Sequence, residues 1–260
     1  MSAENIISRA IVRKYSEKLC SCLRLQVAFV GAGPSSLMAA RELGLAGLKV
    51  AIFERRLAPG GGVWGGGMFF NEAVVQDNVL HILDSFGIGY EAVPDAPGYY
   101  TVDSVELASG LVFGAKKAGV RIFNAVSVED IVFKEQRVQG LVINWSSTKN
   151  SGLPVDPLTV MADVVVDGTG HPSEILRCAC EKAQVRLNTE NGKLMGEKPM
   201  WVESAEQQTV AGTGQYYPGL YACGMSATNA SGGYRMGPIF GGMLLSGQKL
   251  AAQISSELSG

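Results

Sequence analysis

Short apolar runs alternate with stretches of helical periodicity along this chain, a pattern typical of α/β folds built on a central parallel sheet. The run Gln26–Val30 ends at Gly31, a helical stretch covers Leu37–Ala46, and Lys49–Phe53 forms the next run. Strands that are buried on both faces of a sheet read as continuous apolar runs rather than as alternating ones. These residues therefore predict a βαβ unit whose strands lie at the centre of a parallel sheet.

The rest of the chain continues this pattern. Apolar positions recur at helical spacing between Ile6 and Leu19, which predicts an amphipathic N-terminal helix. A polar loop is expected over Ser146–Pro157 and a turn at Glu135-Gln136. No internal repeat or linker is visible, so residues 1–260 are expected to form a single dinucleotide-binding domain. Further helices are expected near Val74–Phe86, Val105–Ala118 and Met243–Leu258, and strands over Val120–Asn124, Val128–Lys134, Val138–Trp145, Val160–Asp167 and Gly219–Met225.

Composition and charge exclude several classes of protein. Hydrophobic residues make up 47% of the 260 residues, enough for a substantial core. The net charge is −2 and the basic residues are scattered, so we expect neither a nucleic-acid partner nor a membrane-surface partner. The five cysteines are an odd number without a secretory leader, and no stretch reaches the ~18 apolar residues of a membrane span. These features predict reduced thiols and a cytoplasmic protein.

A dinucleotide-binding site is predicted at the turn after the first strand. Gly31 permits a tight turn there, and Gly33 lets the backbone approach a pyrophosphate at the N-terminus of the following helix. Glu54 ends the second strand, 23 residues after Gly31, where an acidic side chain accepts hydrogen bonds from ribose hydroxyls. The usual third glycine is replaced by Ser36, so the packing of helix on strand has to accommodate a hydroxymethyl group.

A closing element near the C-terminus refines the fold class. The expected strand Gly219–Met225 is followed by a glycine-rich turn and a helix, as in flavoprotein-like folds with two dinucleotide-binding elements and a central parallel sheet. We therefore expect this Rossmann-type α/β fold. The layout serves both FAD and NAD, and it does not choose between them.

Five separated segments resemble those of the thiamine thiazole synthase family. The resemblance runs nearly end to end and is closest to the archaeal branch of that family. Because the segments occur in the family's order, the match is highly specific. They are Glu54–Met68, Val142–Trp145, Val155–Pro157, Asp167–His171 and Arg235–Met243.

The resemblance implies an enzyme that consumes NAD as a substrate rather than using it as a redox carrier. Nicotinamide would leave, the ADP-ribose would isomerise to a ketone, and that ketone would condense with glycine. Sulfur insertion and ring closure would then give an ADP-linked thiazole carboxylate for thiamine synthesis. In one branch of the family a cysteine of the enzyme supplies the sulfur. The other branch uses free sulfide with bound ferrous ion, and its members are homo-oligomers, with octamers expected.

The same resemblance assigns roles to individual residues. Asp156 and His171 are similar to the catalytic Fe(II) ligands of the sulfide-using branch, with the aspartate coming from a neighbouring subunit; a carboxylate and an imidazole suit that ion. The alternative is structural, with Asp156 capping a turn and His171 capping a helix. Arg235 would hold the carboxylate of glycine, and its alternative is a surface salt bridge. Nucleotide-lining positions would be Gly31, Gly33, Ser35, Glu54, Arg55, Gly62, Val126, Pro154, Val155 and Met225.

Pro154 departs from the family pattern. Cysteine-donating members carry the donor thiol two residues before Asp156, and archaeal sulfide users carry a histidine there. Proline has no sulfur to give, so the sequence predicts sulfide as the donor. Loss of the histidine could also remove the ~10²–10⁴-fold contribution typical of general acid–base catalysis.

Three other functions stay open at this point. The first is a flavin-dependent oxidoreductase on the same fold, and the second is a homologue that stops at isomerised ADP-ribose. The third is a nucleotide-binding scaffold or stress protein without turnover. The pairs Cys20/Cys22 and Cys178/Cys180 lack the spacing of common zinc sites, and we expect buried, unreactive thiols. The alternative is that Cys178 or Cys180 reaches a metal near His171.

Overall fold

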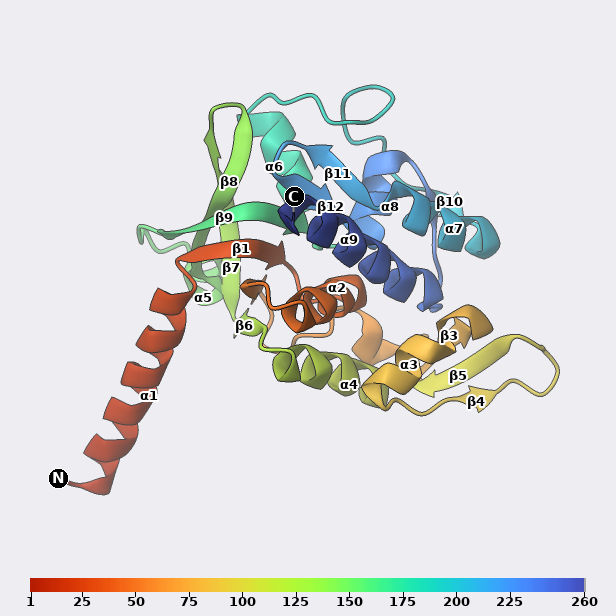
Figure 1. Ribbon diagram of the computed structural model, residues 1–260, viewed down its shortest axis with the longest axis horizontal. Helices are drawn as coiled ribbons and strands as arrows, with labels where there is room; N and C mark the ends of the chain where they lie inside the picture. Colours follow the sequence, from red (N-terminus) through yellow and green to blue (C-terminus); the bar gives the residue numbers. More distant parts are fainter. Residues whose placement is uncertain (260) are drawn as a thin grey trace.

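A mostly parallel sheet forms the centre of the computed structural model, which describes residues 1–259 (Figure 1). The strand order is β11-β12-β9-β1-β2-β6, and β8 and β7 are joined to it through β9. The carboxyl ends of β1, β2, β9 and β12 meet at one edge, because Val30 is in register with Phe53 and Asp167, and Asp167 with Ala222. The predicted Rossmann-type α/β class is confirmed. The strands are β1 (Arg24–Val30), β2 (Val50–Glu54), β6 (Arg121–Asn124), β7 (Val126–Lys134), β8 (Arg137–Trp145), β9 (Leu158–Asp167), β11 (Gly214–Tyr217) and β12 (Leu220–Ala222).

Two apolar cores lie on the two faces of this sheet. Alternate residues of β1 enter different cores: Val27 and Phe29 pack with α2 (Pro34–Leu45), α4 (Ser104–Lys117) and α9 (Gly241–Ser259). Ala28 and Val30 pack on the other side with α6 (Glu174–Lys182) and the β7–β8 hairpin. Because every strand residue of β2 is buried as well, the predicted burial on both faces is confirmed.

One predicted helix is wrong in its first part. Val74–Phe86 was expected to be helical throughout, yet only α3 (Leu80–Phe86) is α-helical, after a short 3-10 turn, η2 (Asp77–Val79). The preceding residues form β3 (Glu72–Gln76), which pairs antiparallel with β5 (Tyr99–Asp103), itself paired with β4 (Glu91–Ala92). A short run of apolar residues satisfies both the strand period and the helix period, and only the distant partner strand decides between them.

The segment between residues 183 and 235 contains elements that apolar periodicity did not reveal. These are β10 (Lys198–Met200), α7 (Val202–Gly212), α8 (Met225–Ser231) and β13 (Tyr234–Arg235). The strand expected over Gly219–Met225 is shorter, because Gly224 has φ +58° and α8 starts at the next residue. The expected polar loop after β8 also holds a short helix, α5 (Ser146–Ser151). The glycine-rich loop after β2 holds a further short 3-10 helix, η1 (Val63–Gly65).

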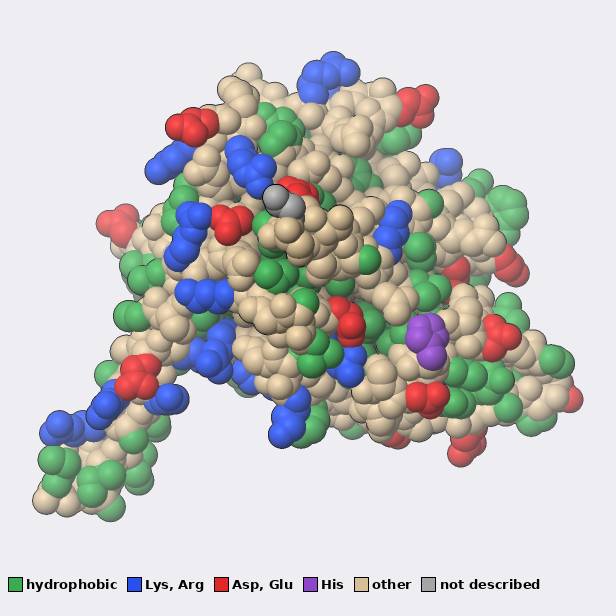
Figure 2. All heavy atoms as spheres, in the orientation of Figure 1, with side chains coloured by type: hydrophobic (Ala, Val, Ile, Leu, Met, Phe, Trp, Pro, Cys, Tyr) green, Lys and Arg blue, Asp and Glu red, His purple; other side chains and the backbone are tan. Residues whose placement is uncertain are grey.

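The predicted N-terminal helix, α1 (Ala3–Ser21), projects away from the rest of the chain, and apolar side chains gather at its free end (Figures 1 and 2). None of its residues is buried, and Ile7 and Ile11 are 58% and 64% exposed. Its base is held by Tyr15 packing edge-on against Phe123 of β6. The apolar stripe of α1 is therefore not covered by its own chain. Within residues 1–259, no helix combines the length and the apolar character that crossing a membrane requires.

Candidate functional site

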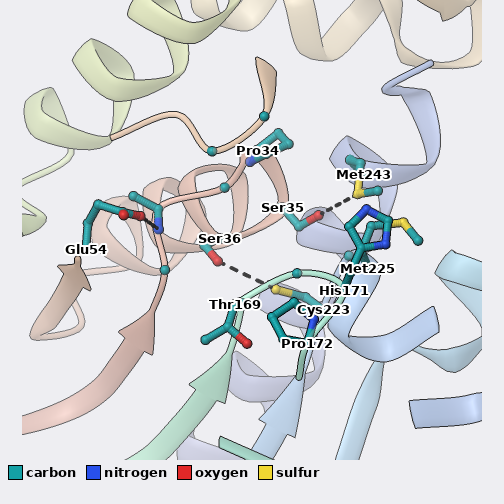
Figure 3. A pocket seen from close by; sticks show the side chains of 18 of the residues that line it. Pro34, Ser35, Ser36, Glu54, Thr169, His171, Pro172, Cys223, Met225 and Met243 are labelled. Atoms are coloured by element: carbon teal, nitrogen blue, oxygen red, sulfur yellow. Dashed lines mark hydrogen bonds between the residues drawn. The ribbon is translucent and has the colours of Figure 1, made fainter. Parts of the chain in front are cut away.

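A cavity of about 640 Å³ opens at the edge where the parallel strands end, and Figure 3 shows it from close by. Its volume is in the usual range for small-molecule and cofactor sites. Three segments far apart in the sequence meet in its walls: the turn after β1, the loop after β9, and the β13–α9 connection. Of the residues singled out in the sequence, it is lined by Gly31, Gly33, Ser35, Glu54, Arg55, Gly62, Val126, His171, Met225 and Arg235.

The turn after β1 leaves no room for a side chain at Gly31. Gly31 has φ +92°, and a Cβ on it would lie 2.5 Å from the carbonyl oxygen of Gly168. Gly33 is the N-cap of α2, whose first residue is Pro34. The N-terminus of this helix therefore faces the cavity, where its free N–H groups and its dipole favour an anion such as a pyrophosphate.

Glu54 is buried and has a structural task in addition to the predicted ribose contact. One carboxylate oxygen accepts a hydrogen bond from the backbone N–H of Ala32 at 2.8 Å, and the other accepts one from Arg56 at 2.7 Å. A carboxylate has about four acceptor positions, so two remain for ligand hydroxyls. Glu54 thus fixes the glycine turn of β1 while it stays able to bind a ribose.

Ser36 replaces the third glycine of the motif, and a glycine in the loop after β9 compensates for it. Ser36 is buried, and its Oγ lies 2.0 Å from where a Cβ on residue 168 would be. That residue is Gly168, so the glycine has moved to the other side of the contact. The hydroxyl also lies 3.8 Å from the Sγ of Cys223 (Figure 3). The absence of a side chain at Gly168 therefore makes room for the hydroxymethyl group of Ser36.

The loop that carries His171 is anchored by the buried carboxylate of Asp167. This carboxylate accepts hydrogen bonds from Thr169, from Ser226 of α8, and from the backbone N–H groups of Ile175 and Leu176 at the start of α6. Burial raises the pKa of Asp167, and these donors oppose the rise. The network ties β9, α6 and α8 together around a short loop, and it fixes the position of His171 at the cavity.

His171 has a carboxylate partner that the sequence did not reveal. Its Nδ1 lies 2.7 Å and 2.9 Å from the two carboxylate oxygens of Glu197. The imidazole makes no other side-chain hydrogen bond within residues 1–259, so Nε2 is left for a ligand or a metal. No sequence signal could have found this pair, because the residues are 26 positions apart and Glu197 lies in a loop without periodicity.

Arg235 lies on β13, in register with Met200 of β10, and its side chain is exposed at the cavity. The alternative of a surface salt bridge is not found: no carboxylate of the described residues pairs with this guanidinium. By contrast, Arg55 at the same cavity pairs with Glu174 at the start of α6. The planar fork of Arg235 is therefore available for a ligand's carboxylate.

Pro154, Val155 and Asp156 do not line the cavity of a single chain. They lie in the exposed segment between α5 and β9, in which Val155 is 50% and Leu158 is 56% exposed. Across residues 1–259, no group of three His, Cys, Asp or Glu side chains is placed to hold a metal ion. Asp156 and His171 therefore do not share the cavity of a single chain, which His171 alone of the two residues lines.

The cysteines show no reactive thiol at the cavity, but the expectation of buried thiols is wrong for Cys20, which is exposed on α1. Cys223 lines it but is buried, and burial raises its pKa to about 12. Cys178 is half-buried beside Asp130, and burial followed by that carboxylate raises its pKa to about 11. Burial also raises the pKa of Cys180. A thiol, unlike a thiolate, is a poor nucleophile and a poor metal ligand.

Alkylation of the native protein by iodoacetamide should follow this order. Cys20 is exposed and should react first, whereas Cys178 and Cys223 should stay unmodified at about pH 8. A pKa of about 11 leaves on the order of 10⁻³ of Cys178 as thiolate at that pH, and its rate should rise about tenfold per pH unit up to about pH 10. Peptide mass spectrometry gives the rate at each site. Fast, pH-independent labelling of Cys178 would contradict the assignment, and urea-unfolded protein provides the control for intrinsic reactivity.

Comparison with known proteins gives full-length matches. Residues 8–240 match the family model described as the Thi4 family. A thiamine thiazole synthase of Desulfosudis oleivorans is 51% identical over 98% of both chains, and one of Thermococcus kodakarensis is 51% identical over 97% of both. The crystal structure of Thermovibrio ammonificans THI4 covers 100% of both chains with 46% identity and a TM-score of 0.97.

Proposed function

This chain belongs to the Thi4 family, and on that premise we propose that it is a thiamine thiazole synthase that converts NAD, glycine and sulfide to an ADP-thiazole carboxylate. The resemblance to thiazole synthases in five segments of the sequence is confirmed by relatives about half identical over the whole chain. The observation that carries the proposal is the full-length match to these relatives. The cavity supports it, because the N-terminus of α2, the carboxylate of Glu54 and the guanidinium of Arg235 all face it.

The cavity supplies contacts for both parts of an ADP-ribosyl group joined to glycine. The N-terminus of α2 would bind the pyrophosphate, and Glu54 would accept hydrogen bonds from a ribose. Arg235 would hold the glycine carboxylate in a bidentate pair. NAD is then a substrate, and the residues at the cavity position its ribose carbon beside the bound amino acid. Positioning of this kind is a major source of rate enhancement when two reactants must meet.

Ferrous ion fits the donors that the chain offers. His171 presents Nε2 at the cavity because Glu197 occupies Nδ1, and an imidazole with a carboxylate suits Fe(II). Asp156 of a second copy would provide that carboxylate. Bound Fe(II) would supply a Lewis-acidic centre that holds sulfide next to the substrate. His171 and Asp156 would hold the ion, and Arg235 would orient the substrate toward it.

Free sulfide is the sulfur source that the residues favour. Pro154 stands at the donor position and contains no sulfur, and the cysteine that lines the cavity is a buried thiol with a pKa raised to about 12. An enzyme that does not consume its own side chain can turn over repeatedly. The described cysteines are all free, which fits the reducing cytoplasm that we propose as its location.

The proposed enzyme is a homo-oligomer, and the family resemblance favours an octamer. Two uncovered apolar regions support assembly: the stripe on α1, with Ile7 and Ile11, and the segment around Val155 and Leu158. Contiguous exposed apolar surface commonly marks a protein–protein contact. Assembly through the second region would also bring Asp156 to a neighbouring cavity, which is what the iron site needs.

An anaerobic product assay tests the function. The pure protein is incubated with NAD, glycine and Fe(II), with and without sulfide, and the products are identified by mass spectrometry. We expect nicotinamide release in both reactions and the thiazole only with sulfide, in more than one equivalent per chain. Thiazole formed without sulfide, or no nicotinamide release, would contradict the proposal. A yellow ~450 nm absorption band in the isolated protein would indicate a flavin enzyme instead.

One observation favours a second candidate function. Pro154 cannot transfer protons where archaeal relatives are expected to carry a histidine, so the late, proton-demanding steps could be slow. A homologue that stops at isomerised ADP-ribose would release nicotinamide and accumulate a ketone. The same assay separates the two functions, because this candidate yields no sulfur-containing product at any sulfide concentration.

A further inference from the structure

Glu197 is a largely buried carboxylate whose two oxygens both face the imidazole of His171. Only 18% of its side chain is exposed, whereas 51% of the His171 side chain is. Both carboxylate oxygens lie within 3 Å of a single atom, the Nδ1 of His171. A carboxylate accepts hydrogen bonds and does not donate them, so this contact requires a proton on Nδ1. The neutral imidazole then has its free lone pair on Nε2.

The backbone on both sides of Glu197 is hydrogen-bonded, which gives this side chain a fixed origin. The N–H of Gly196 donates to the carbonyl of Asn229 at the end of α8, at 3.0 Å. The N–H of Lys198 donates to the carbonyl of Gly233 at 2.9 Å, where β10 begins to pair with β13. Glu197 therefore immediately precedes β10, the strand next to the one that carries Arg235, and its side chain reaches across to the loop after β9.

We infer that Glu197 is the positioning residue of the site: it holds His171 in the Nδ1–H tautomer, with Nε2 as the metal-binding atom, and couples it to the strand of Arg235. Carboxylates that bind the outer nitrogen of a metal-ligating histidine fix the ring orientation and raise its basicity. Here the same short segment, residues 196–200, sets the position of the imidazole and of the guanidinium. The proposed iron ligand, His171, and the proposed glycine-binding residue, Arg235, thus both contact this segment, which fixes their positions relative to each other.

This inference rests on the proposed iron site, and it can be tested without iron. The chain has only two histidines, His81 and His171, so protein labelled with ¹⁵N-histidine and carrying His81→Gln gives the imidazole signals of His171 alone. Magic-angle-spinning NMR of sedimented protein distinguishes protonated from bare ring nitrogens and is not limited by oligomer size. At about pH 9, the metal-free protein should show a protonated Nδ1 and a bare Nε2.

Three variants separate positioning from folding. Glu197→Ala removes the acceptor, and the proton of His171 should then be shared between both nitrogens. Glu197→Gln keeps an amide oxygen that can accept from Nδ1–H, and it should restore the original tautomer in part. Glu190→Ala is the matched control, because this exposed residue lies in the same loop and its side chain makes no hydrogen bond or salt bridge within residues 1–259.

Metal affinity provides the second readout, with Co(II) as the probe in competition with a chelator. Affinity should fall about 10- to 100-fold in Glu197→Ala, less in Glu197→Gln and not at all in Glu190→Ala. An unchanged Nδ1–H tautomer in Glu197→Ala, or a parent protein protonated on Nε2, would overturn the inference. If the tautomer shifts as expected but the parent protein binds no Co(II), the positioning role stands and the iron proposal fails.

Discussion

Replacement of His171 by alanine should abolish thiazole formation while nucleotide binding is nearly unchanged. The variant removes the one imidazole that lines the cavity, which is the proposed metal ligand. Metal assistance supplies several kcal/mol of stabilisation, so the turnover should fall on the order of 10³-fold or more. ADP affinity should change by less than about threefold, because the proposed pyrophosphate and ribose contacts lie on α2 and Glu54. Thiazole yield by mass spectrometry and ADP titration by calorimetry give the two values.

His81→Ala is the matched control for this substitution. His81 is the other histidine of the chain; it is exposed on α3 and does not line the cavity. Its loss should leave both turnover and ADP affinity at the level of the parent protein. Equal turnover in His171→Ala and His81→Ala would remove His171 from the catalytic site. A parallel loss of ADP binding would show that His171 holds the nucleotide instead.

The sequence predicts well those elements whose residue types follow directly from their local burial or backbone conformation. The strands β1 and β2 read as apolar runs because both of their faces are covered. The turn before α2 has a positive φ at Gly31, a conformation that favours glycine. Gly31, Gly33 and Glu54 could be placed together from spacing alone, since the βαβ unit leaves few arrangements. The resemblance in five segments then added residues that spacing does not connect.

The elements that the sequence misses depend on contacts with distant residues. Val74 and Val75 read as part of a helix until β5 provides the partner strand that makes them β3. The strands β10 and β13 pair at Met200 and Arg235 through backbone hydrogen bonds. Almost any residue type can form such bonds, so the sequence does not reveal the pairing. For the same reason Glu197 was not found: nothing in its neighbours indicates the histidine that it contacts.

Ser36 shows how a departure from a motif can be interpreted only with its partner. In the sequence it looks like a misfit at the third glycine of the fingerprint. In the structure its Oγ fills the space left by the missing side chain of Gly168, which follows a different strand. The fingerprint is therefore a property of two facing segments, and one glycine can serve on either side of the contact.

A single methyl group added in the turn at Gly31 should lower both the stability of the protein and its affinity for ADP. In Gly31→Ala the new Cβ lies 2.5 Å from the carbonyl oxygen of Gly168, and the backbone has φ +92°. A left-handed conformation costs an L-residue about 1–2 kcal/mol, and overpacking against fixed backbone adds about 1–3 kcal/mol. The free energy of unfolding should therefore fall by roughly 2–5 kcal/mol, which lowers Tm by roughly 5–15 °C for a chain of this size.

Gly47→Ala separates the two costs, because Gly47 has φ +82° but no atom within 4 Å of the added Cβ. It should lose about 1–2 kcal/mol through backbone conformation alone, and its ADP affinity should match the parent protein. Gly31→Ala should in addition bind ADP more than about 100-fold more weakly, since relief of the clash moves the turn that leads into the N-terminus of α2. Thermal denaturation and calorimetric ADP titration of both variants measure these effects. Equal losses of stability and unchanged ADP affinity in both variants would contradict this prediction. The close contact between the β1 turn and the β9 loop would then not determine ADP binding.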